Sequence, residues 1–175
     1  TVSQKVTATL VGEAGAAWTS SDVLGVYNDA SEKNVKYTCT SASKGTFTAS
    51  TEVSGTPQYA YYPYSDDNAS NDMTAVRGNL PSTQFFSTVL KKMNTDYKIG
   101  VYSSRSWTGY KFSFYHLLTF LKFTINADGT PLQGDELQRI TLEVMTADGQ
   151  PRQMNGQFTF DLTKSSAESI SSWDS

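Results

Sequence analysis

The most apolar run of the chain is Lys111–Asn126, with the sequence KFSFYHLLTFLKFTIN. Its apolar side chains occupy alternate positions up to Phe120, and from Leu121 they occupy the opposite parity. Because a strand has a side-chain period of two, this change of phase requires an extra residue or a local twist. The pattern predicts one long central strand with a bulge near Leu118–Leu121. A short helix at Tyr115–Leu121 is the alternative, since brief apolar runs are ambiguous.

Shorter alternating segments occur along the rest of the chain. Thr1–Val11 places Val2, Val6, Ala8 and Leu10 on one face and polar residues on the other, as in a half-buried strand. Further strands are expected at Val23–Tyr27, Val35–Thr40, Thr46–Ser50, Gln58–Tyr62, Tyr97–Tyr102, Leu137–Thr146 and Gln157–Leu162. Many short strands separated by turn signals predict an all-β fold, a β-sandwich of about seven to ten mostly antiparallel strands.

The segments between these strands are polar. Ser65–Ser82 is the longest, and it is expected to form a long irregular loop. Two turns, Ala127–Pro131 and Ala147–Pro151, share the pattern A-D-G-x-P, in which Asp-Gly accepts a positive φ and proline ends strand pairing. They predict that the last three strands form a meander. We expect one domain over residues 1–163, followed by a polar linker or truncated end, Lys164–Ser175.

Composition narrows the function classes. The chain has 14 basic and 17 acidic residues and a net charge of −3, which argues against a nucleic-acid footprint. Charged residues are 18% and ten residues are tyrosine, a balance that suits an exported or cell-surface β protein. The single Cys39 excludes an internal disulfide and is expected to be a small buried hydrophobe.

Candidate chemistry is sparse. The single histidine, His116, lies on an apolar strand face and is expected to be packed and hydrogen-bonded to the backbone rather than to act as a base. A calcium loop counted from Asp66 fits at its first three ligand positions but has Asn71 where glycine is needed and Arg77 where glutamate is needed. Paired carboxylates for glycoside hydrolysis depend on spacing in space and stay an open alternative at the acidic loop positions. We predict no catalytic residue, no metal site and no cofactor.

Aromatic side chains in or beside predicted loops are the remaining candidates for ligand or partner contacts. Tryptophan and tyrosine stack on sugar rings and anchor protein interfaces. The candidates are Trp18, Tyr62, Tyr64, Trp107 and Tyr110.

Several pieces of the sequence, taken in order, resemble the fimbrillin family of Bacteroidetes surface proteins. They cover nearly the whole chain: Trp18 with Asp22–Tyr27, Tyr37 with Gly45–Phe47, Tyr59–Ser65, Leu80-Pro81 with Gln84, Phe114–Leu118 with Leu121–Ile125, and Met154–Asp161.

The resemblance implies a transthyretin-like β-sandwich that forms the N-terminal domain of a two-domain protein. It also implies a non-enzymatic fimbrial (pilus) subunit or adhesin, exported as a lipoprotein to the outer membrane or fimbrium. Its partners would be other fimbrial subunits, joined by strand donation, and surface glycans or proteins. Thr1–Val11 is the segment expected to be exchanged, because main-chain pairing supplies the affinity of an added strand. The alternative function is a surface carbohydrate-binding module that uses the loop tryptophans and tyrosines.

Overall fold

The computed structural model describes residues 4–11, 17–28, 34–107, 109–121, 123–152, 154–165 and 168–173. The described elements are almost all strands, so the all-β prediction is confirmed. The strands are β1 (Val6–Leu10), β2 (Val23–Asn28), β3 (Val35–Ser41), β4 (Thr46–Thr48), β5 (Pro57–Tyr62), β6 (Val76–Leu80), β7 (Phe86–Ser87), β8 (Lys92–Met93), β9 (Lys98–Ser106), β10 (Gly109–His116), β11 (Gly156–Phe160) and β12 (Ile170–Trp173). Two 3₁₀ turns, η1 (Ala42–Lys44) and η2 (Asp66–Asn68), complete the list.

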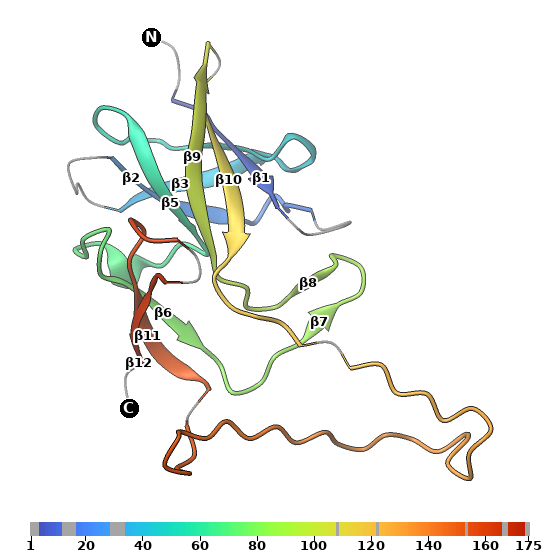
Figure 1. Ribbon diagram of the computed structural model, residues 1–175. Helices are drawn as coiled ribbons and strands as arrows, with labels where there is room; N and C mark the ends of the chain where they lie inside the picture. Colours follow the sequence, from blue (N-terminus) through green and yellow to red (C-terminus); the bar gives the residue numbers. More distant parts are fainter. Residues whose placement is uncertain are drawn as a thin grey trace. The chain divides into compact units, whose positions relative to one another are not determined.

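The largest sheet closes into a barrel instead of opening into the two layers of a sandwich. Its strand order is β1-β10-β9-β5-β2-β3-β4, and Figure 1 shows the long β9–β10 hairpin (yellow-green and yellow) beside β1 (blue). Among the described barrel pairs, β1 with β10 is parallel and the others are antiparallel. Closure is one of the ways in which antiparallel β proteins leave no exposed sheet edge.

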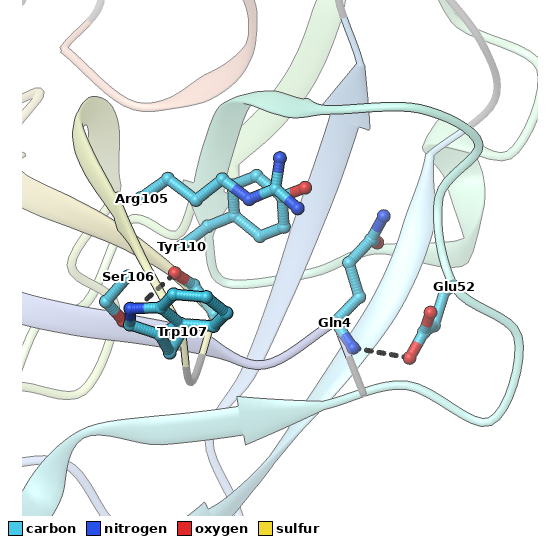
Figure 2. Close-up of a pocket in the computed structure, with 7 residues that line it drawn as sticks. Gln4, Glu52, Arg105, Ser106, Trp107 and Tyr110 are labelled. Atoms are coloured by element: carbon cyan, nitrogen blue, oxygen red, sulfur yellow. Dashed lines mark hydrogen bonds between the residues drawn. The ribbon is translucent and has the colours of Figure 1, made fainter. Parts of the chain in front are cut away.

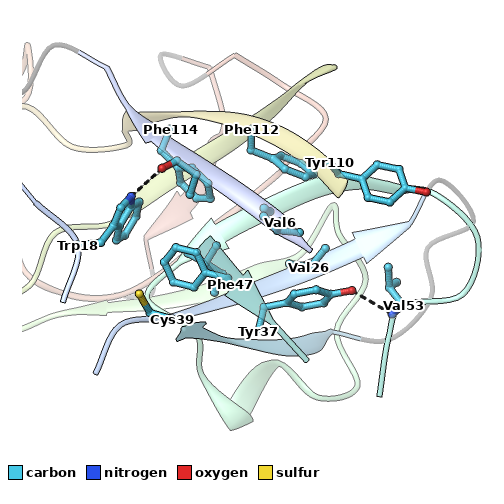
Figure 3. Packing of buried hydrophobic residues seen from close by; sticks show 13 residues of the cluster. Val6, Trp18, Val26, Tyr37, Cys39, Phe47, Val53, Tyr110, Phe112 and Phe114 are labelled. Carbon is cyan, nitrogen blue, oxygen red and sulfur yellow. Dashed lines mark hydrogen bonds between the residues drawn. The ribbon is translucent and has the colours of Figure 1, made fainter. Parts of the chain in front are cut away.

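The barrel interior is filled by the alternate side chains that the sequence pattern placed inward. Phe112 and Phe114 of β10 are 1% and 0% exposed, and Tyr37 and Cys39 of β3 are 0% and 6% exposed. They pack in one cluster together with Phe47 of β4 (Figure 3). Cys39 is a buried free thiol whose pKa is raised by burial, which confirms its expected structural role.

A second sheet has the order β12-β11-β6, and β7 and β8 form a small hairpin. Phe158 and Phe160 of β11 are fully buried and share a cluster with Tyr27 and Tyr61 of the barrel. The rings of Tyr61 and Phe160 meet edge to face, with centroids 5.9 Å apart. The three-stranded sheet therefore covers part of the barrel surface. Since β12 lies within Lys164–Ser175, that segment is more than the predicted polar linker.

The predicted long central strand is wrong at its C-terminal end. β10 ends at His116, and its register shift against β9 falls between Lys111 and Phe112, not at Leu118–Leu121. The bulge is a property of the pairing between β10 and β9, so the sequence of β10 alone does not predict its position. The alternative of a helix at Tyr115–Leu121 is also wrong among the described residues.

Thr119–Met154 is a compact unit separate from the rest of the chain. The predicted strand Leu137–Thr146 is wrong: this segment carries no regular strand, and Ile140, Leu142 and Val144 are exposed by 43%, 53% and 40% instead of facing inward. The predicted meander of the last three strands is therefore absent from the described residues. Both A-D-G-x-P turns are confirmed, with φ of 72° at Gly129 and 78° at Gly149.

Candidate functional site

β1 closes the barrel between β4 and β10. Its residues pair in parallel with Tyr110–Phe114 of β10, while Val6 and Thr7 pair antiparallel with β4. Backbone bonds extend the β10 ladder at both ends, from Tyr110 N to Lys5 O at 2.8 Å and from Val11 N to Phe114 O at 3.0 Å. Without β1, the facing edges of β4 and β10 would lose these partners.

The inward face of β1 is part of the core. Val6 and Ala8 are 0% and 3% exposed, and Leu10 packs against the same cluster, so their predicted common face is confirmed. The indole N–H of Trp18 donates to the carbonyl of Ala8 at 2.9 Å (Figure 3). Burial of one valine side chain stabilises a fold by about 1.5–3 kcal/mol. Val2, the fourth residue assigned to this face, lies outside the described residues.

Gln4 attaches the start of this segment to the loop after β4. Its side-chain amide donates to Val53 O at 2.9 Å and to Gly55 O at 2.8 Å, and its Oε1 accepts the hydroxyl of Tyr37 at 2.6 Å. Tyr37 is fully buried, and burial raises the pKa of its hydroxyl to about 12. Since both ends of the Gln4 amide are engaged, its position is well defined.

A hollow of about 510 Å³ opens beside Gln4. Its wall consists of Glu52, the β9–β10 turn with Trp107, and the flanking Arg105 and Tyr110. Figure 2 shows Arg105, Trp107 and Tyr110 on one side of the hollow and Gln4 with Glu52 on the other. The backbone N–H of Gln4 donates to Glu52 Oε1 at 2.5 Å.

A side-chain bond and a close backbone approach flank the position of Trp107. Ser106 Oγ donates to Gly109 O at 3.3 Å. Gly109 has φ +137°, and a Cβ at this position would lie 2.1 Å from the carbonyl of Lys5. Glycine therefore permits the turn to approach β1 closely. Trp107 itself is 94% exposed, whereas Tyr110 is 7% exposed and lies 5.4 Å from the Arg105 guanidinium, measured to the ring centroid.

A buried ion cluster lies where β9 begins and β10 ends. Asp96 and Lys98 are each 2% exposed and form a salt bridge. The other carboxylate oxygen of Asp96 lies 2.7 Å from His116 Nδ1. His116 therefore meets a buried carboxylate that the sequence did not predict, and β9–β10 pairing places it directly opposite Lys98.

A second ion pair joins Asp22 before β2 to Lys92 of β8. Lys92 Nζ lies 3.1 Å from both carboxylate oxygens, and Tyr62 Oη donates to Asp22 Oδ1 at 2.9 Å. Tyr62 is thus half-buried within a polar network. Trp18, in contrast, is 7% exposed and meets Tyr62 edge to face at 5.3 Å. Trp18 is consequently a core residue and not a surface aromatic.

Tyr64 stands apart from the other predicted aromatics. Its hydroxyl donates to Asp66 Oδ1 at 2.8 Å, and Lys36 lies over its ring at 5.2 Å. Burial and the neighbouring carboxylate raise its pKa to about 12. The structure brings Trp107 and Tyr110 together at one hollow, but it does not bring Trp18, Tyr62 or Tyr64 there.

The prediction of one long irregular loop at Ser65–Ser82 is wrong in part, because this segment contains η2 and the paired strand β6. A buried amide joins these two elements. Asn68 is fully buried; its Nδ2 donates to Arg77 O at 2.9 Å and its Oδ1 accepts Arg77 N at 2.8 Å. Asn71 adds a further bond to Asn68 Oδ1 at 2.8 Å. Asn68, which fits a ligand position of the calcium-loop pattern, therefore forms its hydrogen bonds with other groups of the protein.

The described residues contain no group of three or more His, Cys, Asp or Glu side chains placed to hold a metal ion. Within the same residues, no helix has the length and apolar character needed to cross a membrane.

Gln4, Glu52 and Arg105 are the site residues that sequence reasoning missed. They belong to no motif, and they come from segments about fifty residues apart that only the barrel joins. The position of Trp107 and Tyr110 in or beside a predicted loop was the usable signal. Comparison with protein-family models, with curated proteins and with solved structures gave no match.

Proposed function

We propose that this chain is a non-enzymatic fimbrial subunit or adhesin of a bacterial cell surface, and that it assembles when a strand of a neighbouring subunit takes the place of β1. The observation that carries the proposal is the position of β1 as the strand that closes the barrel between β4 and β10. The sequence resemblance to fimbrillins supports the same function. The partners are other fimbrial subunits, and the location is the outer membrane or the fimbrium.

The groove that β1 fills has the properties of an acceptor for a strand. Two edges supply unpaired backbone donors and acceptors once β1 is absent, and main-chain hydrogen bonds give affinity in strand addition. The floor consists of Phe47, Phe112 and Phe114, each no more than 1% exposed while β1 is present. Exposure of this apolar floor is costly, so a replacement strand would be strongly favoured.

The side chains of β1 also define what a replacement strand needs. Val6 fills a fully buried position, and two residues later Ala8 lies against Trp18, whose indole bonds to its carbonyl. A donor therefore needs a medium apolar residue followed, two positions on, by a small one. This alternate-residue requirement is how an added strand acquires specificity.

The direction of the pairs favours replacement by a strand that runs the opposite way. β1 pairs in parallel along all of its length with β10 and antiparallel with β4 at Val6 and Thr7. A reversed strand would convert the longer β10 interface to antiparallel pairing, which is slightly more stable per residue. The exchange would thus gain stability along the longer of the two edges.

We include in this proposal the transthyretin-like β-sandwich that the resemblance to fimbrillins implies. A sandwich and a barrel bury the same alternate residues of each strand, so the inward faces of the strands suit both.

A reversible lock on β1 tests the proposal. In a Cys39→Ala background, Thr7→Cys with Thr46→Cys places two cysteines directly opposite each other on β1 and β4. The chain is treated with an Arg/Lys-specific protease, which can cut at Lys5 directly before β1, and filaments are sought by electron microscopy. Uptake of a labelled peptide that copies residues 4–11 is measured in parallel. Assembly and peptide uptake are expected in the reduced protein and are expected to stop on oxidation.

The matched control locks strands that stay in place. Thr38→Cys with Thr48→Cys joins β3 to β4 in the same sheet and leaves β1 free. This variant should assemble and take up peptide whether reduced or oxidised. The proposal fails if the reduced β1 variant neither assembles nor takes up peptide, or if the two locks have equal effects.

A further inference from the structure

The hollow beside the β9–β10 turn has a flat aromatic surface that no core contact explains. Trp107 is 94% exposed, although an indole is among the most apolar side chains. After Trp107 the chain approaches β1 closely at Gly109, where a Cβ would lie 2.1 Å from the carbonyl oxygen of Lys5. Single exposed apolar residues are common, but this one borders a hollow that is also lined by polar groups.

The polar groups at the hollow are of two complementary kinds. Glu52 is a carboxylate, which only accepts hydrogen bonds, and the Gln4 N–H uses one of its roughly four lone-pair positions. Arg105 is a guanidinium, which only donates. It lies over the face of the Tyr110 ring, 5.4 Å from the centroid, and it carries five N–H donors.

The floor of the hollow is organised before any ligand arrives. Gln4 is held by three side-chain bonds, to Val53, Gly55 and the buried Tyr37. Ordered polar groups at a site lower the entropy cost of binding, because fewer side chains are immobilised by the ligand. The volume of about 510 Å³ lies in the usual range for small-molecule sites, about 300–1,000 Å³.

We propose that this hollow binds a neutral saccharide. The face of a pyranose ring stacks on Trp107, Glu52 accepts hydrogen bonds from ring hydroxyls, and Arg105 donates to hydroxyl oxygens. A hydroxyl both donates and accepts, so a pair of neighbouring hydroxyls satisfies one acceptor and one donor group at once. The opposite charges of Glu52 and Arg105 balance each other in the hollow, so a saccharide without a net charge matches these two groups better than an acidic or a basic one. The class of ligand is therefore a neutral hexose within a glycan.

The first experiment is a printed array that carries neutral oligosaccharides ending in glucose, galactose, mannose, fucose or N-acetylhexosamine, together with sialylated and sulfated ones. The full chain is applied, and the strongest neutral oligosaccharide is then titrated calorimetrically. Trp107→Ala should weaken binding roughly 10- to 100-fold, which corresponds to about 1.4–2.8 kcal/mol, because the apolar C–H face of the pyranose loses the indole face against which it packs. Glu52→Gln and Arg105→Gln should each weaken it on the order of tenfold.

Two control variants make the result specific to the site. Trp107→Phe keeps a smaller ring and should retain part of the affinity. Phe85→Ala removes another exposed aromatic, 65% exposed, from a loop that does not line the hollow, and it should bind as the original chain does. Far-ultraviolet circular dichroism of each variant shows that folding is unchanged, which is expected because the replaced side chains lie at the surface.

Each other outcome overturns the inference. Absence of binding to every neutral oligosaccharide at millimolar concentration removes it, and so does binding that Trp107→Ala leaves unchanged. A preference for sialylated or sulfated glycans shows that the ligand class is acidic and that the role given to Glu52 is wrong. The measurement uses the chain before any protease treatment, so its result is independent of strand exchange.

Discussion

Replacement of Asp96 by asparagine is expected to destabilise the barrel strongly. The substitution keeps the size of the side chain and removes its charge. Lys98, which is 2% exposed and bridged to Asp96, would then be a buried cation without its carboxylate. Removal of one partner of a buried ion pair costs about 3–5 kcal/mol, since the desolvated charge that remains is uncompensated.

The complementary substitution Lys98→Met should cost less. Asp96 would then keep the hydrogen bond at 2.7 Å to His116 Nδ1, so its carboxylate would still have a polar partner. The double variant Asp96→Asn with Lys98→Met contains neither charge and should lie closer to the original chain than Asp96→Asn does. Replacement of a whole buried pair by uncharged groups is often neutral or stabilising.

Urea unfolding followed by tryptophan fluorescence measures these differences. A slope of about 2 kcal/mol per M lies within the range for small proteins, so a loss of about 3–5 kcal/mol lowers the midpoint by about 1.5–2.5 M. The three variants and the original chain form a double-mutant cycle, and a coupling energy of about 2 kcal/mol or more is expected. If the two single costs are equal and simply add in the double variant, the reasoning about a buried, coupled pair is refuted.

Three further predictions concern packing, ionisation and backbone geometry. Phe114→Ala should lower the free energy of unfolding by about 3–5 kcal/mol, because the ring is fully buried. Phe123→Ala replaces a side chain that is 51% exposed and should lower it by less than about 1 kcal/mol. Equal losses in urea titration would contradict the assigned burial of these two rings. The pKa of Tyr37 is 10.0 when unfolded and about 12 when folded, so its contribution to the free energy of unfolding is complete below pH 10 and declines as the pH rises toward 12. Tyr37→Phe should therefore make the alkaline loss of stability shallower. An unchanged dependence of unfolding free energy on pH would show that burial does not raise this pKa. Gly45→Ala should lower the melting temperature more than Gly129→Ala, measured by calorimetry. Both glycines have positive φ, but a Cβ at Gly45 would lie 2.3 Å from a β1 carbonyl oxygen, whereas a Cβ at Gly129 would meet nothing within 4 Å. The reverse order of melting temperatures would contradict the close approach of β1 to Gly45.

The site was predictable only in part. Trp107 and Tyr110 were candidates because aromatic residues near turns are often accessible, and both line the hollow. Trp18 satisfied the same criterion and is buried against Ala8. Position in a loop does not determine exposure, since a loop can fold a side chain into the barrel. Glu52 and Arg105 lacked any local signal, because their role depends on where the barrel places them.

Two segments with the same alternating pattern show most clearly what a local sequence pattern cannot predict about the fold. Phe112 and Phe114 lie in β10 and are buried, whereas Leu142 and Val144 alternate equally well and are exposed outside any regular strand. Alternation decides which side chains share a face, but a strand also needs a neighbouring edge for its backbone hydrogen bonds. The pattern of one segment does not show whether such a neighbouring strand edge is available.

The sequence by itself determined the all-β class, the inward faces of β1, β3 and β10, and the two Asp-Gly turns, because a period of two and the preference of glycine for positive φ are local properties. The tertiary structure alone decided that β1 lies parallel to β10, that His116 meets Asp96, and that one hollow collects residues from three distant segments. These features depend on which edges pair and in which register, and pairing between distant segments is set by the packing of the whole barrel.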